Sequence, residues 1–243
     1  MDPREREKRT SAEAAAIAVE DGMTLGLGTG STVALFLPAL ARRRLNVTCV
    51  ATSPATEQAA RALGLVVEPF DLLDRLDLAV DGADQVASDF WLVKGGGGAH
   101  TREKVVAAAA DRFVVIVSSD KMVDALRPPI PLEILRFGAR AAVRSLSELG
   151  PVEPRDAPQT PDGNLLFDYL GPVGDPAALA AAFETVPGLA GHGLFVPDLV
   201  DEVLVGRADG TVMRRINFRL DPGGEPDPHA PGVRGDRSPG EDR

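Results

Sequence analysis

The first 125 residues alternate between short apolar segments and segments of helical composition, and this alternation constrains the fold more than any other feature. Strands that alternate with helices indicate crossover connections, which build a parallel sheet covered by helices on both faces. We therefore expect a doubly wound, mostly parallel α/β sheet. The expected strands lie near 23–28, 46–52, 65–68, 76–80, 90–94 and 113–117, and the expected helices near 12–20, 31–44, 54–63 and 101–110.

After Pro131 the pattern changes to that of a second, smaller α+β unit. We expect strands near 132–135, 192–196 and 202–205, a hairpin around 161–163, helices near 138–149 and 176–185, and a last strand from 211 to 217 that returns to the main body. The predicted domains are an α/β catalytic domain of residues 1–127 plus 206–220, a small α+β domain of residues 128–205, and a Pro- and Gly-rich tail of residues 221–243 that is expected to be disordered.

The chain carries 36 acidic and 26 basic residues, a formal net charge of -10. This charge argues against non-specific electrostatic binding to nucleic acid or to an anionic membrane. The apolar stretches are too short to span a bilayer, and residues 1–10 are charged where a signal peptide would be apolar. The single cysteine, Cys49, excludes an internal disulfide and is expected to be buried. We expect a cytoplasmic protein without nucleic-acid or membrane partners.

The first glycine-rich loop, Gly26-Leu-Gly-Thr-Gly-Ser-Thr32, stands between an expected strand and an expected helix. Such a loop can direct backbone N–H groups at an anion, and the helix dipole and the hydroxyls of Ser31 and Thr32 would add to the site. It matches neither the dinucleotide fingerprint nor the Walker loop. The alternative is a simple tight turn in which Ser31 caps the helix.

Two carboxylates, Asp81 and Asp84, follow the buried strand at 76–80, where open α/β sheets place their ligands. The alternative is an Asx turn at the strand end. The spacing also fits a metal site, but no third group of ligands has suitable spacing, and His100, His192 and His229 are scattered. We therefore expect no metal and no organic cofactor.

Four consecutive glycines, Gly95 to Gly98, follow Lys94. Ordering such a run costs conformational entropy, so folded proteins usually keep one where the backbone must approach a ligand closely or adopt positive φ. Glu103 stands in the first turn of the next helix, where it is either a catalytic base or a partner of the helix dipole. The dipole alone would lower its pKa, so a catalytic role requires burial. His100 is a rival base.

Only four of the 26 basic residues are lysines, namely Lys8, Lys94, Lys104 and Lys121. In an arginine-rich chain, these positions can mark sites that require a compact ammonium group, although chance survival on the surface explains Lys104 and Lys8 equally well. The whole inventory suits a phosphorylated small molecule that undergoes proton transfer. The N–H groups of Gly95 to Gly97 could stabilise an oxyanion while a carboxylate moves a carbon-bound proton.

Together these segments resemble the ribose-5-phosphate isomerases of the A type. The resemblance rests on GLGTGST at 26–32, DGAD at 81–84, KGGGGAHTREKVVA at 94–107, SSDK at 118–121, PLEI at 131–134, and the later VPGLAGHGLF and VLVG. It implies interconversion of ribose 5-phosphate and ribulose 5-phosphate through an enediolate, without metal or cofactor. It also implies a doubly wound domain with a smaller α+β domain, assembled as a homodimer or homotetramer.

By this resemblance Glu103 is the catalytic base. The implied substrate-binding residues are Thr29, Gly30, Ser31, Thr32, Asp81, Gly82, Ala83, Asp84, Lys94, Gly95, Gly96, Gly97, Lys121 and Lys8. The resemblance assigns sugar hydroxyls and ring opening to Asp81, Asp84 and Lys94, and it assigns the phosphate to the first loop and the basic residues.

The chain departs from the family pattern at Gln85, Gly98, His100 and Arg136, none of which removes a proposed catalytic group. Two other functions stay open at this point: a non-catalytic sugar-phosphate sensor, and a related sugar-phosphate isomerase or deaminase. A DNA-reading regulator would need an additional module, and only about twenty residues precede the first expected strand.

Overall fold

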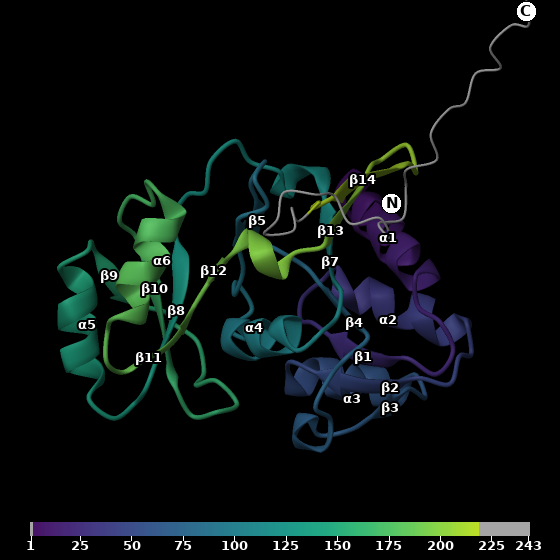
Figure 1. The fold of residues 1–243 in the computed structure, drawn as a ribbon, viewed down its shortest axis with the longest axis horizontal. Coiled ribbons are helices and arrows are strands. Elements are labelled where there is room, and N and C mark those ends of the chain that lie inside the picture. Colours follow the sequence, from purple (N-terminus) through teal and green to yellow (C-terminus); the bar gives the residue numbers. More distant parts are fainter. Residues whose placement is uncertain (1, 219–243) are drawn as a thin grey trace, which may run out of the picture.

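The computed structural model describes residues 2–218 of the chain. Its largest element is a seven-stranded sheet in the order β14-β13-β7-β4-β1-β2-β3, in which only the edge pair β13–β14 is antiparallel (Figure 1). The strands are β1 (Thr24–Leu27), β2 (Thr48–Ala51), β3 (Val66–Val67), β4 (Leu78–Asp81), β7 (Phe113–Ser118), β13 (Glu202–Gly206) and β14 (Val212–Ile216). This is the predicted α/β architecture with a mostly parallel sheet.

Helices cover both faces of this sheet because its strands send alternate side chains to opposite sides. Val114 and Ile116 of β7 belong to the same buried cluster as residues of α1, α2 and α3, whereas Val115 and Val117 belong to the cluster that includes residues of α4. These helices are α1 (Pro3–Ile17), α2 (Val33–Arg42), α3 (Pro54–Ala62) and α4 (His100–Ala108). We call the seven-stranded sheet with these helices the large unit.

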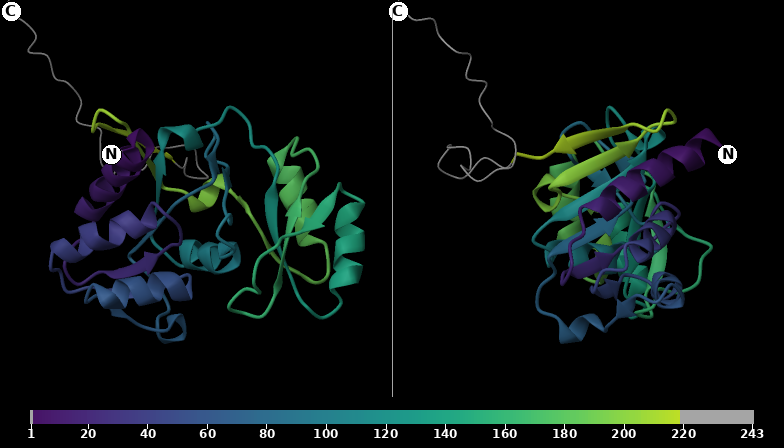
Figure 2. Two further views of the ribbon diagram at one scale, coloured as in Figure 1. Left: turned by 180° about the vertical axis from the view of Figure 1, so that it is seen from behind. Right: turned by 90° about the vertical axis from the view of Figure 1, so that its right-hand side faces the viewer.

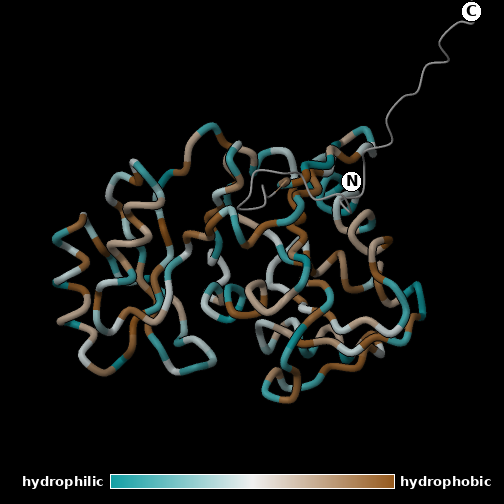
Figure 3. Tube along the Cα trace, viewed as in Figure 1, coloured by the Kyte–Doolittle hydropathy of each residue, from teal (hydrophilic) through white to brown (hydrophobic). Residues whose placement is uncertain are grey.

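The small unit consists of a four-stranded antiparallel sheet in the order β11-β8-β10-β9 with α5 and α6. Its elements are β8 (Ile130–Ile134), α5 (Ala139–Ser147), β9 (Val152–Pro154), β10 (Leu165–Tyr169), α6 (Pro176–Glu184) and β11 (Leu189–His192). The two units lie side by side, with α4 between them (Figures 1 and 2). Each unit has a hydrophobic interior of its own (Figure 3).

A three-stranded sheet in the order β12-β6-β5 adjoins both units. Its strands are β5 (Gln85–Val86), β6 (Leu92–Val93) and β12 (Leu194–Phe195). Phe195 packs in the core of the large unit and Leu194 in that of the small unit.

The structure corrects two expectations. The strand at 202–205, which the sequence analysis groups with the small domain, is β13 and lies inside the large sheet between β7 and β14. All five residues of β13 are buried, as in a central strand, but local sequence does not show which sheet such a strand joins. The first helix spans Pro3–Ile17 rather than 12–20, because Asp2 caps it and Pro3 occupies its first turn.

The predicted tail at 221–243 lies outside the described residues, and the division into domains stays a prediction. Cys49 is fully buried, as expected. Among residues 2–218, no helix combines the length and apolar character needed to cross a bilayer.

Candidate active site

A crevice of about 170 Å³ opens at the carboxyl ends of β1 and β4, where the sheet order reverses direction. Leu27 of β1 lies opposite Val80 of β4, so the loops that follow these strands are neighbours. Ligands of open α/β sheets bind at such switch points. The residues that line the crevice are Arg4, Lys8, Thr29, Gly30, Ser31, Thr32, Gly82, Ala83, Asp84, Lys94, Gly95, Gly96, Gly97, Glu103, Asp120 and Lys121.

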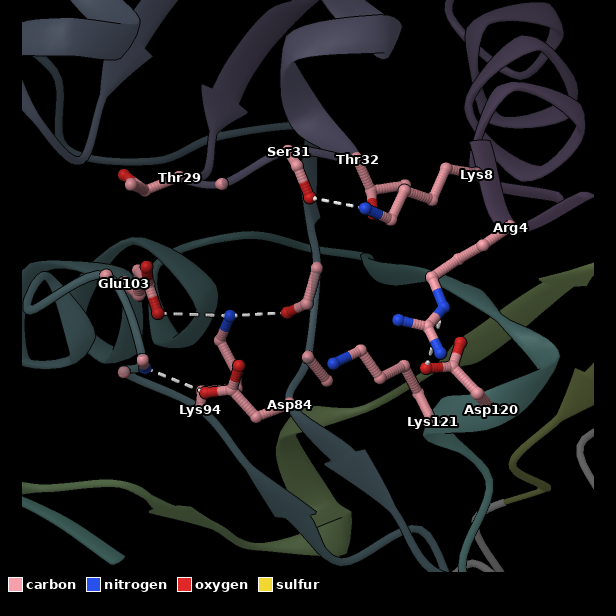
Figure 4. A pocket seen from close by; sticks show the side chains of 16 residues that line it. Arg4, Lys8, Thr29, Ser31, Thr32, Asp84, Lys94, Glu103, Asp120 and Lys121 are labelled. Carbon is pink, nitrogen blue, oxygen red and sulfur yellow. Dashed lines mark hydrogen bonds and ion pairs between the residues drawn. The ribbon is translucent and has the colours of Figure 1, made fainter. Parts of the chain in front are cut away.

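Lys94 is the buried centre of this site, with only 2% of its surface exposed. Its Nζ donates to Asp81 Oδ2 at 2.8 Å and to the Gly82 carbonyl at 2.6 Å, and it lies 3.1 Å from Glu103 Oε2. Burial alone would lower the pKa of Lys94, but the two carboxylates outweigh it and raise that pKa above its ordinary value. The lysine therefore stays charged beside both acids, and Figure 4 shows its contact with Glu103.

Asp81 is the one predicted binding residue that does not line the crevice, because it lies beneath it, 3% exposed. Besides Lys94, it accepts hydrogen bonds from the backbone N–H groups of Thr29 at 3.0 Å and Gly82 at 2.7 Å. Gly28 makes this arrangement possible, since a Cβ at that position would lie 2.0 Å from the Asp81 carboxyl group. Asp81 thus joins the first loop to Lys94.

Glu103 stands in the first turn of α4, is 4% exposed, and faces the crevice. Its burial, reinforced by the negative charge of Asp81, raises its pKa to about 8 despite the opposing effect of Lys94. Burial is the largest cause of this rise in pKa, and the helix dipole acts in the opposite direction. The raised pKa is appropriate for a base that works near neutral pH.

The glycine run forms a tight turn in which Gly98 N–H donates to the Gly95 carbonyl at 3.0 Å. Gly95 and Gly98 have φ of +105° and +75°, which explains why glycine is needed at both positions. The Gly96 N–H donates to Asp84 Oδ2 at 2.7 Å, so this amide already has a partner. Within residues 2–218, the N–H groups of Gly95 and Gly97 make no backbone or side-chain hydrogen bond, and they stay available for a ligand.

The other end of the crevice is cationic (Figure 4). Lys8 on α1 donates from Nζ to Ser31 Oγ at 3.0 Å, and Lys121 lies nearby in the short turn Ser119–Lys121. Arg4, one helical turn before Lys8, lies 3.5 Å from Asp120. Hydroxyl groups, cations and the start of α2 therefore converge on one region that is suited to a phosphate group.

Arg4 and Asp120 also line the crevice but were not predicted from the sequence. Arg4 precedes Lys8 by four residues, so both lie on the same side of a helix that begins at Pro3. The helix predicted at 12–20 contains neither residue, so their common direction could not be inferred from it. Asp120 stands inside the quoted SSDK motif, beside Lys121. Arg4 and Lys8 reach the crevice because α1 packs on β7 and β13.

None of the four departures from the family pattern lines the crevice. His100 is fully buried under Gly95 and does not line the crevice, and burial lowers its pKa to about 4, so of the two candidate bases only Glu103 faces the crevice. Gln85 exchanges hydrogen bonds of 2.7 and 2.8 Å with the backbone of Arg127. Among residues 2–218, no group of three or more His, Cys, Asp or Glu side chains is placed to hold a metal ion.

Comparison with known proteins decides the family. The family model of ribose 5-phosphate isomerase A (phosphoriboisomerase A) matches residues 48–210, which is more than half of the chain. The chain belongs to the ribose 5-phosphate isomerase A family. Ribose-5-phosphate isomerase A of Caulobacter sp. (strain K31) is 44% identical over 218 residues, covering 85% of this chain and 96% of that protein. The protein of that name from Haloarcula marismortui is 42% identical over 221 residues, covering 86% of this chain and 96% of that protein.

Solved structures of ribose 5-phosphate isomerase A have the same fold. The Neisseria gonorrhoeae enzyme superposes with a TM-score of 0.84 at 30% identity, covering 89% of this chain and 98% of that one. A D-ribose-5-phosphate isomerase in complex with phospho-erythronic acid superposes with a TM-score of 0.82 at 33% identity, covering 88% of this chain and 99% of that one. The recognition of this family from sequence motifs is therefore confirmed.

Proposed function

We propose that this protein is a ribose-5-phosphate isomerase, which interconverts D-ribose 5-phosphate and D-ribulose 5-phosphate by proton transfer through an enediolate. The observation that carries the proposal is the Lys94–Glu103 pair, a buried carboxylate of raised pKa held 3.1 Å from an ammonium group at the wall of the crevice. This pair supplies a base and a positive charge for the developing oxyanion.

The two ends of the crevice set the direction in which the substrate would bind. Lys8, Ser31 and Lys121 favour the phosphate at the cationic end, and this leaves the carbon chain to extend toward Glu103 (Figure 4). In this orientation the first two carbons lie at the base. Asp84 and Lys94 then serve the sugar hydroxyls and the opening of the ring, Asp81 holds Lys94 in place from beneath the crevice, and Thr29 to Thr32 complete the phosphate site.

The reaction needs one base that acts twice. Deprotonated Glu103 removes the hydrogen from C2 of the open-chain aldose, and the electron pair forms the C1–C2 double bond of the enediolate. Glu103 then returns the proton to C1, while the proton of the C2 hydroxyl passes to the oxygen on C1, which gives the ketose. Lys94 and the N–H groups of Gly95 and Gly97 stabilise the negative oxygen between these steps.

The direct test is to incubate the purified protein with ribose 5-phosphate and a chelator and to follow ketose formation. We expect turnover that the chelator does not change. Absence of ketose at substrate saturation would contradict the proposal, and a rate abolished by the chelator would contradict its metal-free form.

The alternatives predict other results. A sensor would bind ribose 5-phosphate without turnover, and an amino-sugar deaminase would turn over its own substrate faster than ribose 5-phosphate. The comparisons with known proteins favour neither.

Three finer predictions accompany the proposal: a cytoplasmic location, a homodimer or homotetramer, and a place in the non-oxidative branch of the pentose phosphate pathway. The expected partner is a small sugar phosphate.

A further inference from the structure

The glycine turn that faces the substrate is held from the small unit by Arg155. This arginine follows β9, and its Nη1 donates to the Gly95 carbonyl at 2.8 Å and lies 3.4 Å from the Gly96 carbonyl oxygen. Four glycines have little conformational preference of their own, so external contacts must fix the direction of their amides. Arg155 supplies such a contact from outside the crevice.

Arg155 is itself fixed by Asp168 of β10. Its Nε donates to Asp168 Oδ2 at 3.0 Å and its Nη2 donates to Asp168 Oδ1, so that the two planar groups form a bidentate pair. The side chains are only 17% and 21% exposed, and the Arg155 backbone N–H continues the β9–β10 ladder by donating to Leu166. The guanidinium group is therefore an immobilised part of the small sheet.

One peptide group receives both anchors. The Gly95 carbonyl that accepts from Arg155 and the Gly96 N–H that donates to Asp84 Oδ2 belong to the same peptide bond. A cation at its oxygen and an anion at its nitrogen orient this peptide and strengthen both hydrogen bonds. A change in the position of Arg155 would therefore shift this peptide group and, through its N–H, the Asp84 carboxylate, which lines the crevice.

We propose that Arg155, held by Asp168, is a positioning residue that aligns the Gly95–Gly96 peptide and, through it, Asp84 and the neighbouring amides of the crevice. The small unit thus completes the site although none of its residues lines the crevice. This inference rests on the proposed isomerase function, because it is expressed through that reaction.

The test compares Arg155→Met and Arg155→Lys with Asp162→Asn as a matched control. Asp162 also belongs to the small unit and binds Arg102 of α4 through hydrogen bonds of 2.8 and 2.7 Å, but among the described residues it forms no hydrogen bond or ion pair with the glycine turn. We expect kcat for ribose 5-phosphate to fall roughly tenfold to a hundredfold in Arg155→Met and less in Arg155→Lys, which keeps one donor. Asp162→Asn is expected to stay within about twofold of the unmodified protein.

Two further readouts separate positioning from general loosening. Inhibition by inorganic phosphate should be unchanged in Arg155→Met, because its proposed binding groups lie at the cationic end, whereas phospho-erythronic acid, which also carries a carboxylate, should bind more weakly. The double variant Arg155→Met/Asp84→Asn should be no slower than Asp84→Asn alone, since both changes disturb one connected unit.

Unchanged kcat in Arg155→Met, equal losses in Asp162→Asn, or additive losses in the double variant would overturn the inference. If Arg155→Met does not fold, kcat of Arg155→Lys is measured instead, together with kcat of the double variant Asp168→Asn/Asp84→Asn. Unchanged kcat in the first or additive losses in the second would overturn the inference in the same way. An inactive unmodified protein would refute the proposed function instead, so the two failures are distinguishable.

Discussion

At the scale of single residues, burial and hydrogen bonding determine the chemistry of the crevice. Glu103 and Lys94 are almost inaccessible to solvent, and both are paired. Asp81 also accepts from Thr29 of the first loop, and both Asp81 and Lys94 bond to the backbone of Gly82 in the loop after β4. The base therefore depends on an arrangement of residues that are distant in sequence.

The raised pKa of Glu103 predicts the pH dependence of the reaction. The base acts only when deprotonated, so kcat/KM should rise with pH and level off only above the value of about 8. Below that pKa it should fall about tenfold for each pH unit. A profile measured from pH 6 to 9, with circular dichroism to confirm that the protein stays folded, checks this. A flat profile above pH 6 would show an ordinary carboxylate instead.

Lys8 makes a separate prediction, because it bonds to Ser31 at the cationic end of the crevice, where the proposed function places the phosphate. Lys8→Met removes a charged hydrogen-bond donor, so KM for ribose 5-phosphate should rise about tenfold or more while kcat changes little. Arg61→Met is the matched control, since Arg61 pairs with Glu57 on the outer side of α3. Steady-state kinetics checks this. An unchanged KM in Lys8→Met would place the phosphate elsewhere.

At the scale of elements, local patterns predict most helices and strands but not their partners. The expected helices at 31–44, 54–63 and 101–110 are confirmed as α2, α3 and α4, and the apolar run from Phe113 is β7. The prediction that the strand at 202–205 belongs to the small domain was wrong, because β13 pairs with β7, whose residues are far away in the chain. Arg155 was missed for the same reason, since its partners at Gly95 and Asp168 come from another loop and strand.

The packing of α1 on β13 links an element to substrate binding. Gly206 lies against α1, and a Cβ there would lie 1.9 Å from the Glu7 carbonyl oxygen, which belongs to the backbone. Gly206→Ala must therefore displace the helix that carries Arg4 and Lys8. We expect a loss of about 1–3 kcal/mol in the free energy of unfolding and a raised KM, measured by urea titration and kinetics. Unchanged values for both would contradict this packing.

At the scale of the whole molecule, buried histidines at the junction of the units make stability depend on pH. Burial, with the nearby charge of Lys104 contributing, lowers the pKa of His192 to about 3, and burial lowers that of His100 to about 4. Both are neutral when folded but bind protons below about pH 6.5 when unfolded. Their contribution to stability is therefore complete above pH 6.5 and declines as the pH falls toward these lower values.

The expected decline is about 1.4 kcal/mol per pH unit for each histidine, measured by urea unfolding at pH 7, 6 and 5. His192→Asn should lessen this slope, because an amide oxygen can accept the Leu194 N–H, which bonds to His192 Nδ1 at 3.3 Å, without titrating. An identical slope in the variant would mean that other groups cause the loss.

The account depends on one carboxylate that moves hydrogen between two carbons, and Glu103→Gln tests it most directly. The variant keeps the size of the side chain and removes the buried charge, so the fold should remain intact by thermal unfolding. Its kcat for ribose 5-phosphate should fall roughly 10²- to 10⁴-fold. In D₂O the unmodified protein should place deuterium on C1 of the ketose in those turnovers in which the proton on Glu103 exchanges with solvent before its return. A folded Glu103→Gln variant with kcat near that of the unmodified protein would contradict the assignment of the base.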